Sequence, residues 1–235
     1  MRRHLRILWH ITWQALGYIL LPAICALGIV YVISAVQGEV VGQSQIGFVS
    51  DICTVVILFL FFFKTRPSYV RDFFSQKLSL SRIGLLIPIS IGARLLLAVL
   101  VMAIVAIGGE SLGNALSEGV EFQWDGVNTD TLLSLIATLG SFVILTPIHE
   151  ELFFRGAVMG YLKEHYSPKV AILYSTYVFA LLHGHPGLYP STFFLGLILA
   201  LVYHRWNNIW YPIILHMLIN FHPFVIDWVI SRGFF

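Results

Sequence analysis

Seven apolar stretches, each close to the length that a helix needs to cross a bilayer, run through this 235-residue chain. About 20 mainly apolar residues suffice for one crossing, because the hydrocarbon core is about 30 Å thick. Four stretches are long, and the last three are shorter or broken by proline; in chain order they are 15–36, 46–63, 83–107, 132–158, 170–187, 190–204 and 209–231. This pattern predicts an all-α fold, a polytopic membrane bundle of about 7–8 helices.

The composition agrees with a chain that lies mostly in lipid. Hydrophobic residues make up 58% of it and charged residues 11%, whereas soluble domains average about 45–50% and about 25%. These values exclude a soluble globular domain, a disordered chain and a nucleic-acid binder. No soluble domain fits between the apolar stretches, so we expect residues 1–235 to form a single transmembrane domain.

Loop charges predict which helix ends face the cytoplasm, because Lys and Arg are enriched in cytoplasmic loops. The segment 64–82 carries five basic residues and one acidic residue, whereas 108–131 carries five acidic residues and no basic one. We therefore place 64–82 and the arginine-rich N-terminus in the cytoplasm, and 37–45 and 108–131 outside. The predicted localisation is the cell membrane, with several crossings and a cytoplasmic N-terminus.

Ionisable residues inside membrane helices are costly and usually functional, and the fourth stretch holds several in the sequence HEELFFR at 149–155. Glu151 and Arg155 are four residues apart on one helix face, so we expect them to pair. Glu150 lies about 100° round the helix from Glu151 and faces a different group, where a carboxylate can act as general base or acid. A structural ion-pair network of the three residues is the alternative.

A second polar site follows in the next stretch, at His183. Ser167-Pro168 is a helix-start signal, with serine as the N-cap and proline at the first helical position, so the chain turns just before it. Glu150 and His183 are each about 16 residues, or roughly 25 Å of helix, from that turn. Equal offsets in an antiparallel hairpin mean equal depth, so we predict that Glu150 and His183 lie at one level. A histidine satisfied within the core is the alternative.

A third site lies on the last stretch, where His216 and Asn220 are four residues apart on one helix face. The turn at 205–208 returns this helix alongside 190–204 and brings the pair near the level of His183. Two such groups can donate hydrogen bonds into a shared space, as an oxyanion site requires. An interhelical hydrogen-bond pair is the alternative.

Arg94 is a lone charged residue midway along the third stretch. A charge at this depth is expensive unless it has a partner. We expect a structural role, in which Arg94 pairs with a carboxylate of the 149–155 cluster or with Asp51.

The polar residues together predict hydrolysis by an activated water. No serine or cysteine lies in a nucleophile setting and no Gly-x-Ser-x-Gly motif occurs, which argues against a covalent intermediate. Glu150 can take the proton of the water while His183 holds the water in place, and the oxyanion can be stabilised by His216 and Asn220. The predicted reaction is hydrolysis of an amide bond within or beside the bilayer.

A metal ion is the competing device. The zinc-binding helix His-Glu-x-x-His would need a second histidine where Phe153 stands. Zinc can still be bound by Glu150, His183 and His216, which make a His₂Glu set with an open position for water. The residues alone leave both mechanisms open.

Three motifs in this order, Glu-Glu-x-x-x-Arg, Phe-x-x-x-His and His-x-x-x-Asn, resemble those of the CPBP family, also called Abi, over about 147–222. The family name covers CAAX prenyl endopeptidases and bacteriocin-processing enzymes. The resemblance implies an intramembrane endopeptidase with core helices at 132–222 and an active site in a membrane cavity open toward the cytoplasmic side. It also implies Glu150 as the base and His183 as its partner, an oxyanion site at His216 and Asn220, and supporting roles for Glu151 and Arg155.

The resemblance further implies a peptide or protein tail as substrate, with the lipid bilayer as the other partner and no nucleic acid. We favour a reaction without a cofactor, because carboxylate, imidazole and amide groups suffice for it; zinc is the alternative. A different class of function is a non-catalytic membrane protein that binds a peptide, confers bacteriocin self-immunity or signals. A proton-coupled carrier would need ionisable groups in both halves, and the spans of the first half hold only Asp51 and Arg94.

Overall fold

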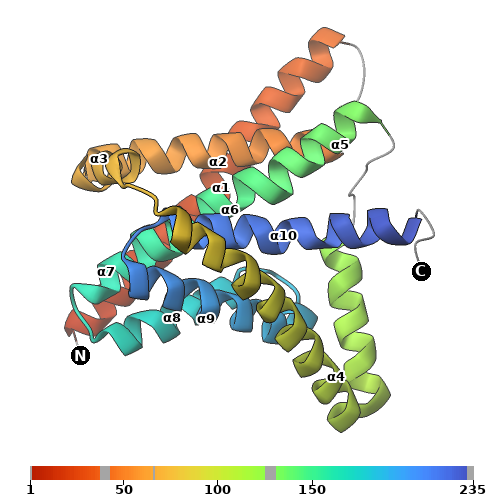
Figure 1. The fold of residues 1–235 in the computed structure, drawn as a ribbon. Coiled ribbons are helices and arrows are strands. Elements are labelled where there is room, and N and C mark those ends of the chain that lie inside the picture. The colour runs from red at the N-terminus through yellow and green to blue at the C-terminus, as the bar shows by residue number, and fades with distance from the viewer. Residues whose placement is uncertain (1, 38–42, 66, 125–130, 232–235) are drawn as a thin grey trace. The chain divides into compact units, whose positions relative to one another are not determined.

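The computed structural model describes residues 2–37, 43–65, 67–124 and 131–231, which are almost entirely helical, with no strand among them (Figure 1). Among these described residues, four helices are long and apolar enough to cross a membrane: Gln45–Thr65, Leu80–Glu118, Leu132–Lys163 and Pro186–Trp206. Three shorter apolar helices accompany them: Leu20–Ala35, Pro168–Leu181 and Trp210–Ile226. Each predicted stretch corresponds to one of these helices, so the all-α polytopic membrane fold is confirmed.

The chain forms two compact units, and the first comprises Met1–Ser75 and Gly126–Phe153. Its early helices are α1 (Arg2–Gln37), α2 (Gln43–Thr65) and the short α3 (Pro67–Ser75). Its later helical segments are α5 (Leu132–Thr138), the π-helix η1 (Leu139–Leu145) and α6 (Thr146–Glu151). α2 packs against α1 and α3 and also against α5, η1 and α6, so it is the central helix of this unit.

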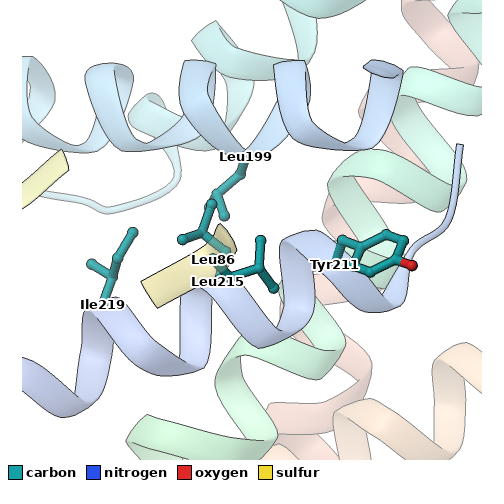
Figure 2. Close-up of a cluster of buried hydrophobic side chains, with 5 residues drawn as sticks. All are labelled: Leu86, Leu199, Tyr211, Leu215 and Ile219. Carbon is teal, nitrogen blue, oxygen red and sulfur yellow. The ribbon is translucent and has the colours of Figure 1, made fainter. Parts of the chain in front are cut away.

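The second unit comprises Gln76–Asp125 and Phe154–Phe235. Its helical segments are α4 (Leu80–Trp124), most of the π-helix η2 (Leu152–Met159), α7 (Gly160–Lys163), α8 (Pro168–Leu181), the 3₁₀ turn η3 (Pro186–Leu188), α9 (Tyr189–Trp206) and α10 (Trp210–Ser231). α8 packs against α9, and α10 packs against both α9 and α4. Figure 2 shows the apolar core of this unit, to which α4, α9 and α10 contribute Leu86, Leu199, Tyr211, Leu215 and Ile219.

Local signals set the helix boundaries around the predicted site. Ser167 has extended backbone angles and Pro168 begins α8, as the sequence predicts. Asn207 ends α9 in the left-handed conformation with φ 46°. Asn208 then holds the turn into α10, because its Oδ1 accepts a hydrogen bond from the Trp210 amide at 2.9 Å. The predicted turns before α8 and before α10 are therefore both present.

The acidic segment after the third apolar stretch is helical, whereas a loop was expected there. α4 continues to Trp124, and Gly109 breaks it into two helices with φ 64°. Glycine adopts this left-handed backbone without steric cost, so it allows the chain to change direction within one residue. Glu110 and Glu118 therefore lie on a second helical segment. Three further acids used to predict the orientation, Glu39, Asp125 and Asp130, lie outside the described residues.

Candidate active site

Two π-helical segments flank the helix that carries Glu150. η1 ends where α6 begins, and η2 begins where α6 ends. At the first junction the Thr146 amide donates to the Ser141 carbonyl, five residues back. Such turns are rare and frequently lie at functional sites. Glu150 and Glu151 both lie in α6, so the predicted rotation of about 100° between their side chains applies. Arg155 lies in η2, so the α-helical geometry that predicted a shared face for Glu151 and Arg155 does not apply there.

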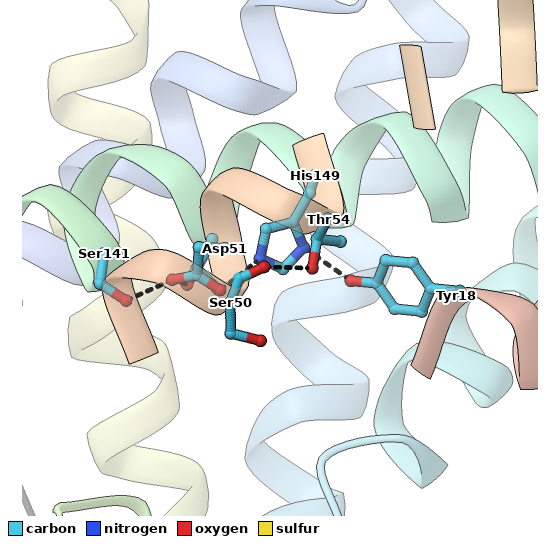
Figure 3. Close-up of polar contacts among 7 residues, drawn as sticks. Tyr18, Ser50, Asp51, Thr54, Ser141 and His149 are labelled. Carbon is cyan, nitrogen blue, oxygen red and sulfur yellow. Dashed lines mark hydrogen bonds and ion pairs between the residues drawn. The ribbon is translucent and has the colours of Figure 1, made fainter. Parts of the chain in front are cut away.

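His149 directly precedes Glu150, is itself buried, and belongs to a partly buried hydrogen-bonded chain of the first unit (Figure 3). Its Nε2 is 3.0 Å from Oδ1 of Asp51, and its Nδ1 is 2.7 Å from the Tyr18 hydroxyl. A carboxylate accepts hydrogen bonds, so in the neutral imidazole Nε2 donates to Asp51 while Nδ1 accepts from Tyr18. An acid thus orients an imidazole, which in turn accepts from a hydroxyl.

Asp51 has three side-chain donors in the first unit. Its Oδ2 accepts hydrogen bonds from Ser141 and, at 3.2 Å, from Thr146, in addition to the contact of Oδ1 with His149. These contacts tie α2 to η1 and α6. From the sequence, Asp51 was expected only as a possible partner of Arg94, and no role was expected for His149. The signal for this network was present, since both residues are ionisable and lie inside apolar spans.

The two glutamates of α6 differ in exposure. Glu151 is fully buried, whereas Glu150 is partly exposed. Tyr18 is linked to Asp51 through His149, whose ring contacts both side chains. The ring of Tyr18 is held by Phe153, on which it stacks with centroids 4.1 Å apart and planes 6° apart.

Arg155 is fully buried in the second unit and links η2 to α9. Its Nη2 donates to the Gly196 carbonyl at 2.7 Å, and its guanidinium lies 4.8 Å from the centroid of the Phe179 ring. Gly196 permits this close packing, because a Cβ at that position would lie 2.8 Å from Cδ1 of Phe179. The expected pairing of Arg155 with Glu151 stays a prediction, and the contacts with Gly196 and Phe179 were not predicted.

His183 lies in the turn just after α8, which ends at Leu181 and not near 187 as expected. Gly184 follows with φ 80°, and this left-handed backbone ends the helical path. The Nδ1 of His183 is 2.8 Å from the Phe179 carbonyl. A carbonyl can only accept, so Nδ1 carries the proton and Nε2 is the basic nitrogen of the neutral ring.

Phe179 also connects His183 to the third predicted site. The ring centroid of Phe179 is 4.5 Å from that of His183 and 6.0 Å from that of His216. His216 and Asn220 are buried on α10, at 2% and 7% exposure. The second unit therefore gathers one histidine from the end of α8 and one from α10 round a single buried ring, with Asn220 one turn farther along α10.

The predicted residues are divided between the two units. Glu150 and Glu151 belong to the first unit, and Arg155 together with His183, His216 and Asn220 belongs to the second. The equal depth of Glu150 and His183 stays a prediction. The Nη2 of Arg94 donates to the backbone carbonyl of Ile219 on α10, at 2.5 Å, a contact that was not predicted. The expected pairing of Arg94 with an acid of the first unit stays a prediction.

The donor set of the zinc alternative is chemically suitable. Metal-binding histidines usually donate their second ring N–H to a carboxylate or backbone carbonyl, and His183 does so to Phe179. Glu150, His183 and His216 would hold the ion, which would act as a Lewis acid. Within each unit taken alone, the described residues contain no group of three or more His, Cys, Asp or Glu side chains placed to hold a metal.

Comparison with known proteins gives a family and one curated relative. Residues 132–222 match the model of the family described as type II CAAX prenyl endopeptidase Rce1-like. Over 100 residues the chain is 32% identical to a Bacillus subtilis (strain 168) protein named "Putative membrane peptidase YdiL", and the match covers 40% of each chain. No solved structure matches the chain. The resemblance to the CPBP family predicted from the three motifs is confirmed, and the matched segment contains every residue of those motifs.

Proposed function

We propose that this multi-pass membrane protein is an intramembrane endopeptidase, in which Glu150 and His183 activate a water that hydrolyses a peptide bond. The observation that carries the proposal is the convergence of His183 and His216 on the Phe179 ring, within a segment similar to an endopeptidase family. A basic Nε2 on His183, set by the hydrogen bond of Nδ1 to the Phe179 carbonyl, supports it.

The proposed reaction begins with a water that donates hydrogen bonds to the Glu150 carboxylate and to Nε2 of His183. Glu150 takes one proton as the water oxygen bonds to the carbonyl carbon of the substrate. The negative charge that develops on the carbonyl oxygen is stabilised by donors from His216 and the Asn220 amide. The C–N bond then breaks, and the proton held by Glu150 passes to the leaving amine, which restores the carboxylate.

The proposed substrate is a peptide or protein tail that enters a membrane cavity open toward the cytoplasmic side. The description of the matching family names CAAX prenyl endopeptidases, so a tail with a prenylated cysteine is the first class to examine. The second class is an unprenylated apolar peptide. An internally quenched peptide that ends in farnesyl-Cys-Val-Ile-Met, with its unprenylated counterpart, separates the two classes.

The proposed reaction uses no metal. Carboxylate, imidazole and amide groups supply the base, the orientation of the water and the oxyanion donors, so zinc is not needed for any of these steps. Purified protein whose zinc content is negligible by elemental analysis is expected to keep its activity after treatment with 1,10-phenanthroline. Loss of activity on chelation with recovery on zinc addition would instead support a site at Glu150, His183 and His216.

The first prediction concerns Glu150→Gln, measured with the two quenched peptides in detergent. This change keeps the size of the side chain but removes its basicity, so kcat/KM is expected to fall by about 10²–10⁴-fold, the usual contribution of a general base. His183→Gln is expected to lower it by a similar order. Glu164→Gln is the matched control, because Glu164 is an exposed acid beyond α7 and is expected to leave cleavage unchanged.

Cleavage at the wild-type rate by Glu150→Gln and His183→Gln would refute the assignment. The alternative of a non-catalytic protein predicts that wild-type protein cleaves neither peptide and that Glu150→Gln retains peptide binding and the cellular phenotype.

A further inference from the structure

The proposed reaction leaves unexplained why α4 carries a charged side chain midway along an apolar span. Arg94 is the residue concerned, and it is partly buried. A charge at such a position is unfavourable unless a specific interaction compensates for it. Within the second unit, the partner of its Nη2 is the backbone carbonyl of Ile219.

That carbonyl lacks its usual partner because of Pro223. In an α-helix the N–H of residue 223 would donate to the carbonyl of residue 219. Proline has no N–H, and its ring pushes against the same carbonyl. Pro223 lies inside α10, and Ile219 is 3% exposed. The fold thus places a freed carbonyl in apolar surroundings, where an unsatisfied backbone group is costly.

Arg94 supplies the missing donor. Its Nη2 lies 2.5 Å from the Ile219 oxygen, and a hydrogen bond from a charged donor is stronger than one from an amide. Guanidinium groups stay charged, so the donor does not depend on pH. The interaction therefore closes the gap that Pro223 leaves in the hydrogen-bond ladder of α10.

The register between α4 and α10 places Arg94 at this carbonyl. Leu86, Ser90 and Arg94 are spaced four residues apart and share one face of α4. Leu86 packs in the core cluster with Ile219 (Figure 2), and the Ser90 Oγ is 3.4 Å from Nε2 of His222. Three successive turns of α4 therefore face the part of α10 that contains Ile219 and His222.

We propose that Arg94 is a positioning residue that caps the carbonyl freed by Pro223 and thereby holds the turn of α10 that carries His216 and Asn220. Ile219 is directly adjacent to Asn220 in the chain. If the Ile219 carbonyl lost its donor and the backbone rearranged, the side-chain amide of Asn220 would change its orientation. The capping itself stands on the geometry, and its effect on catalysis rests on the proposed function.

The test is a double-mutant cycle of Arg94→Met and Pro223→Ala in the full chain, purified in detergent. Arg94→Met alone is expected to lower the Tm by roughly 4–8 °C, if loss of the cap costs about 2 kcal/mol. Pro223→Ala restores the N–H that Ile219 lacks, so in that background Arg94→Met is expected to lower the Tm by less than half as much. Such non-additivity is the signature of direct coupling.

Activity toward the quenched peptides gives a second readout. Arg94→Met is expected to lower kcat about tenfold with KM changed less than about twofold, and Pro223→Ala is expected to recover most of the loss. Arg94→Lys keeps a charged donor and is expected to lower the Tm and kcat less than Arg94→Met does. The same variant can be used in the cycle if Arg94→Met is too unstable to purify. Ser90→Ala is the control, because Ser90 contacts α10 at His222 and its effect should not depend on residue 223.

Equal losses from Arg94→Met in the wild-type chain and in the Pro223→Ala variant would overturn the proposal and show that Arg94 acts through its charge elsewhere. A wild-type protein that cleaves neither peptide would count against the proposed function alone, because the Tm cycle still decides whether Arg94 caps Ile219. Coupling in Tm with no effect of Arg94→Met on kcat would keep the cap but overturn its role in positioning Asn220.

Discussion

Single polar side chains inside the spans have specific partners, and Asp51 is the clearest case. Its carboxylate accepts from Ser141, Thr146 and His149, and His149 in turn accepts from Tyr18. Removing one member of a buried network leaves the others unsatisfied, which is more costly than the net value of a single hydrogen bond. The network therefore stabilises α2 against η1 and α6 and sets the orientation of the residue before Glu150.

Asp51→Asn tests this network at the residue scale. The amide keeps the volume but replaces one acceptor oxygen with a donor, which then faces groups that also donate. The free energy of unfolding is expected to fall by about 1–3 kcal/mol, measured as a lower Tm in detergent. Asp72→Asn is the control, because Asp72 is exposed and its Oδ1 lies 4.0 Å from Nε of Arg71. Exposed ion pairs contribute about 0–1 kcal/mol to the free energy of unfolding. A similar Tm for both variants would contradict the assigned role of Asp51.

At the scale of helices, close approach between α8 and α9 determines where the histidines of the second unit lie. Phe179 of α8 is fully buried and packs on Gly196 of α9, while His183 and His216 lie round the same ring. Arg155 donates to the Gly196 carbonyl. A side chain at position 196 would therefore disturb the site without touching a predicted catalytic group.

Gly196→Ala is expected to destabilise the protein, although alanine is the better helix former. The gain in helix propensity is about 0.5–1 kcal/mol, but a Cβ would lie 2.8 Å from the buried Phe179 ring, and overpacking typically costs about 1–3 kcal/mol. Gly92→Ala is the matched control on α4, because a Cβ there meets nothing within 4 Å. We expect Gly196→Ala to lower the Tm and Gly92→Ala to keep or raise it; the reverse order would show that the packing argument is wrong.

At the scale of the whole molecule, the chain is a multi-pass membrane protein made of two compact units. The excess of basic residues in 64–82 and of acidic residues in 108–131 predicts opposite sides of the membrane for these segments. The helical break at Gly109 lies between the apolar part of α4 and the acids that follow it. The break therefore marks the point where α4 is expected to leave the bilayer on the outer side.

Cysteine labelling tests this orientation in a Cys25→Ser, Cys53→Ser background. A membrane-impermeant maleimide added to intact cells is expected to label Glu110→Cys but not Lys77→Cys. After permeabilisation both are expected to react, which controls for accessibility. Labelling of Lys77→Cys in intact cells, with Glu110→Cys protected, would reverse the predicted orientation and place the N-terminus outside.

The sequence alone determined the helical fold, the positions of the four long and three shorter apolar helices among the described residues, and the family resemblance of 132–222. Apolar length, proline positions and motif spacing are properties of short segments. It also identified the start of α8 and the turn before α10, since capping and turn signals act over a few residues. Only the tertiary structure decided three contacts. Arg94 donates to the Ile219 carbonyl, which lacks a helical donor because of Pro223. Asp51 accepts from His149, and His183 donates from Nδ1 to the Phe179 carbonyl. Each of these contacts depends on which groups lie close together between helices or at a helix end. A buried polar group must form a hydrogen bond, and its partner is whichever group the packing places beside it.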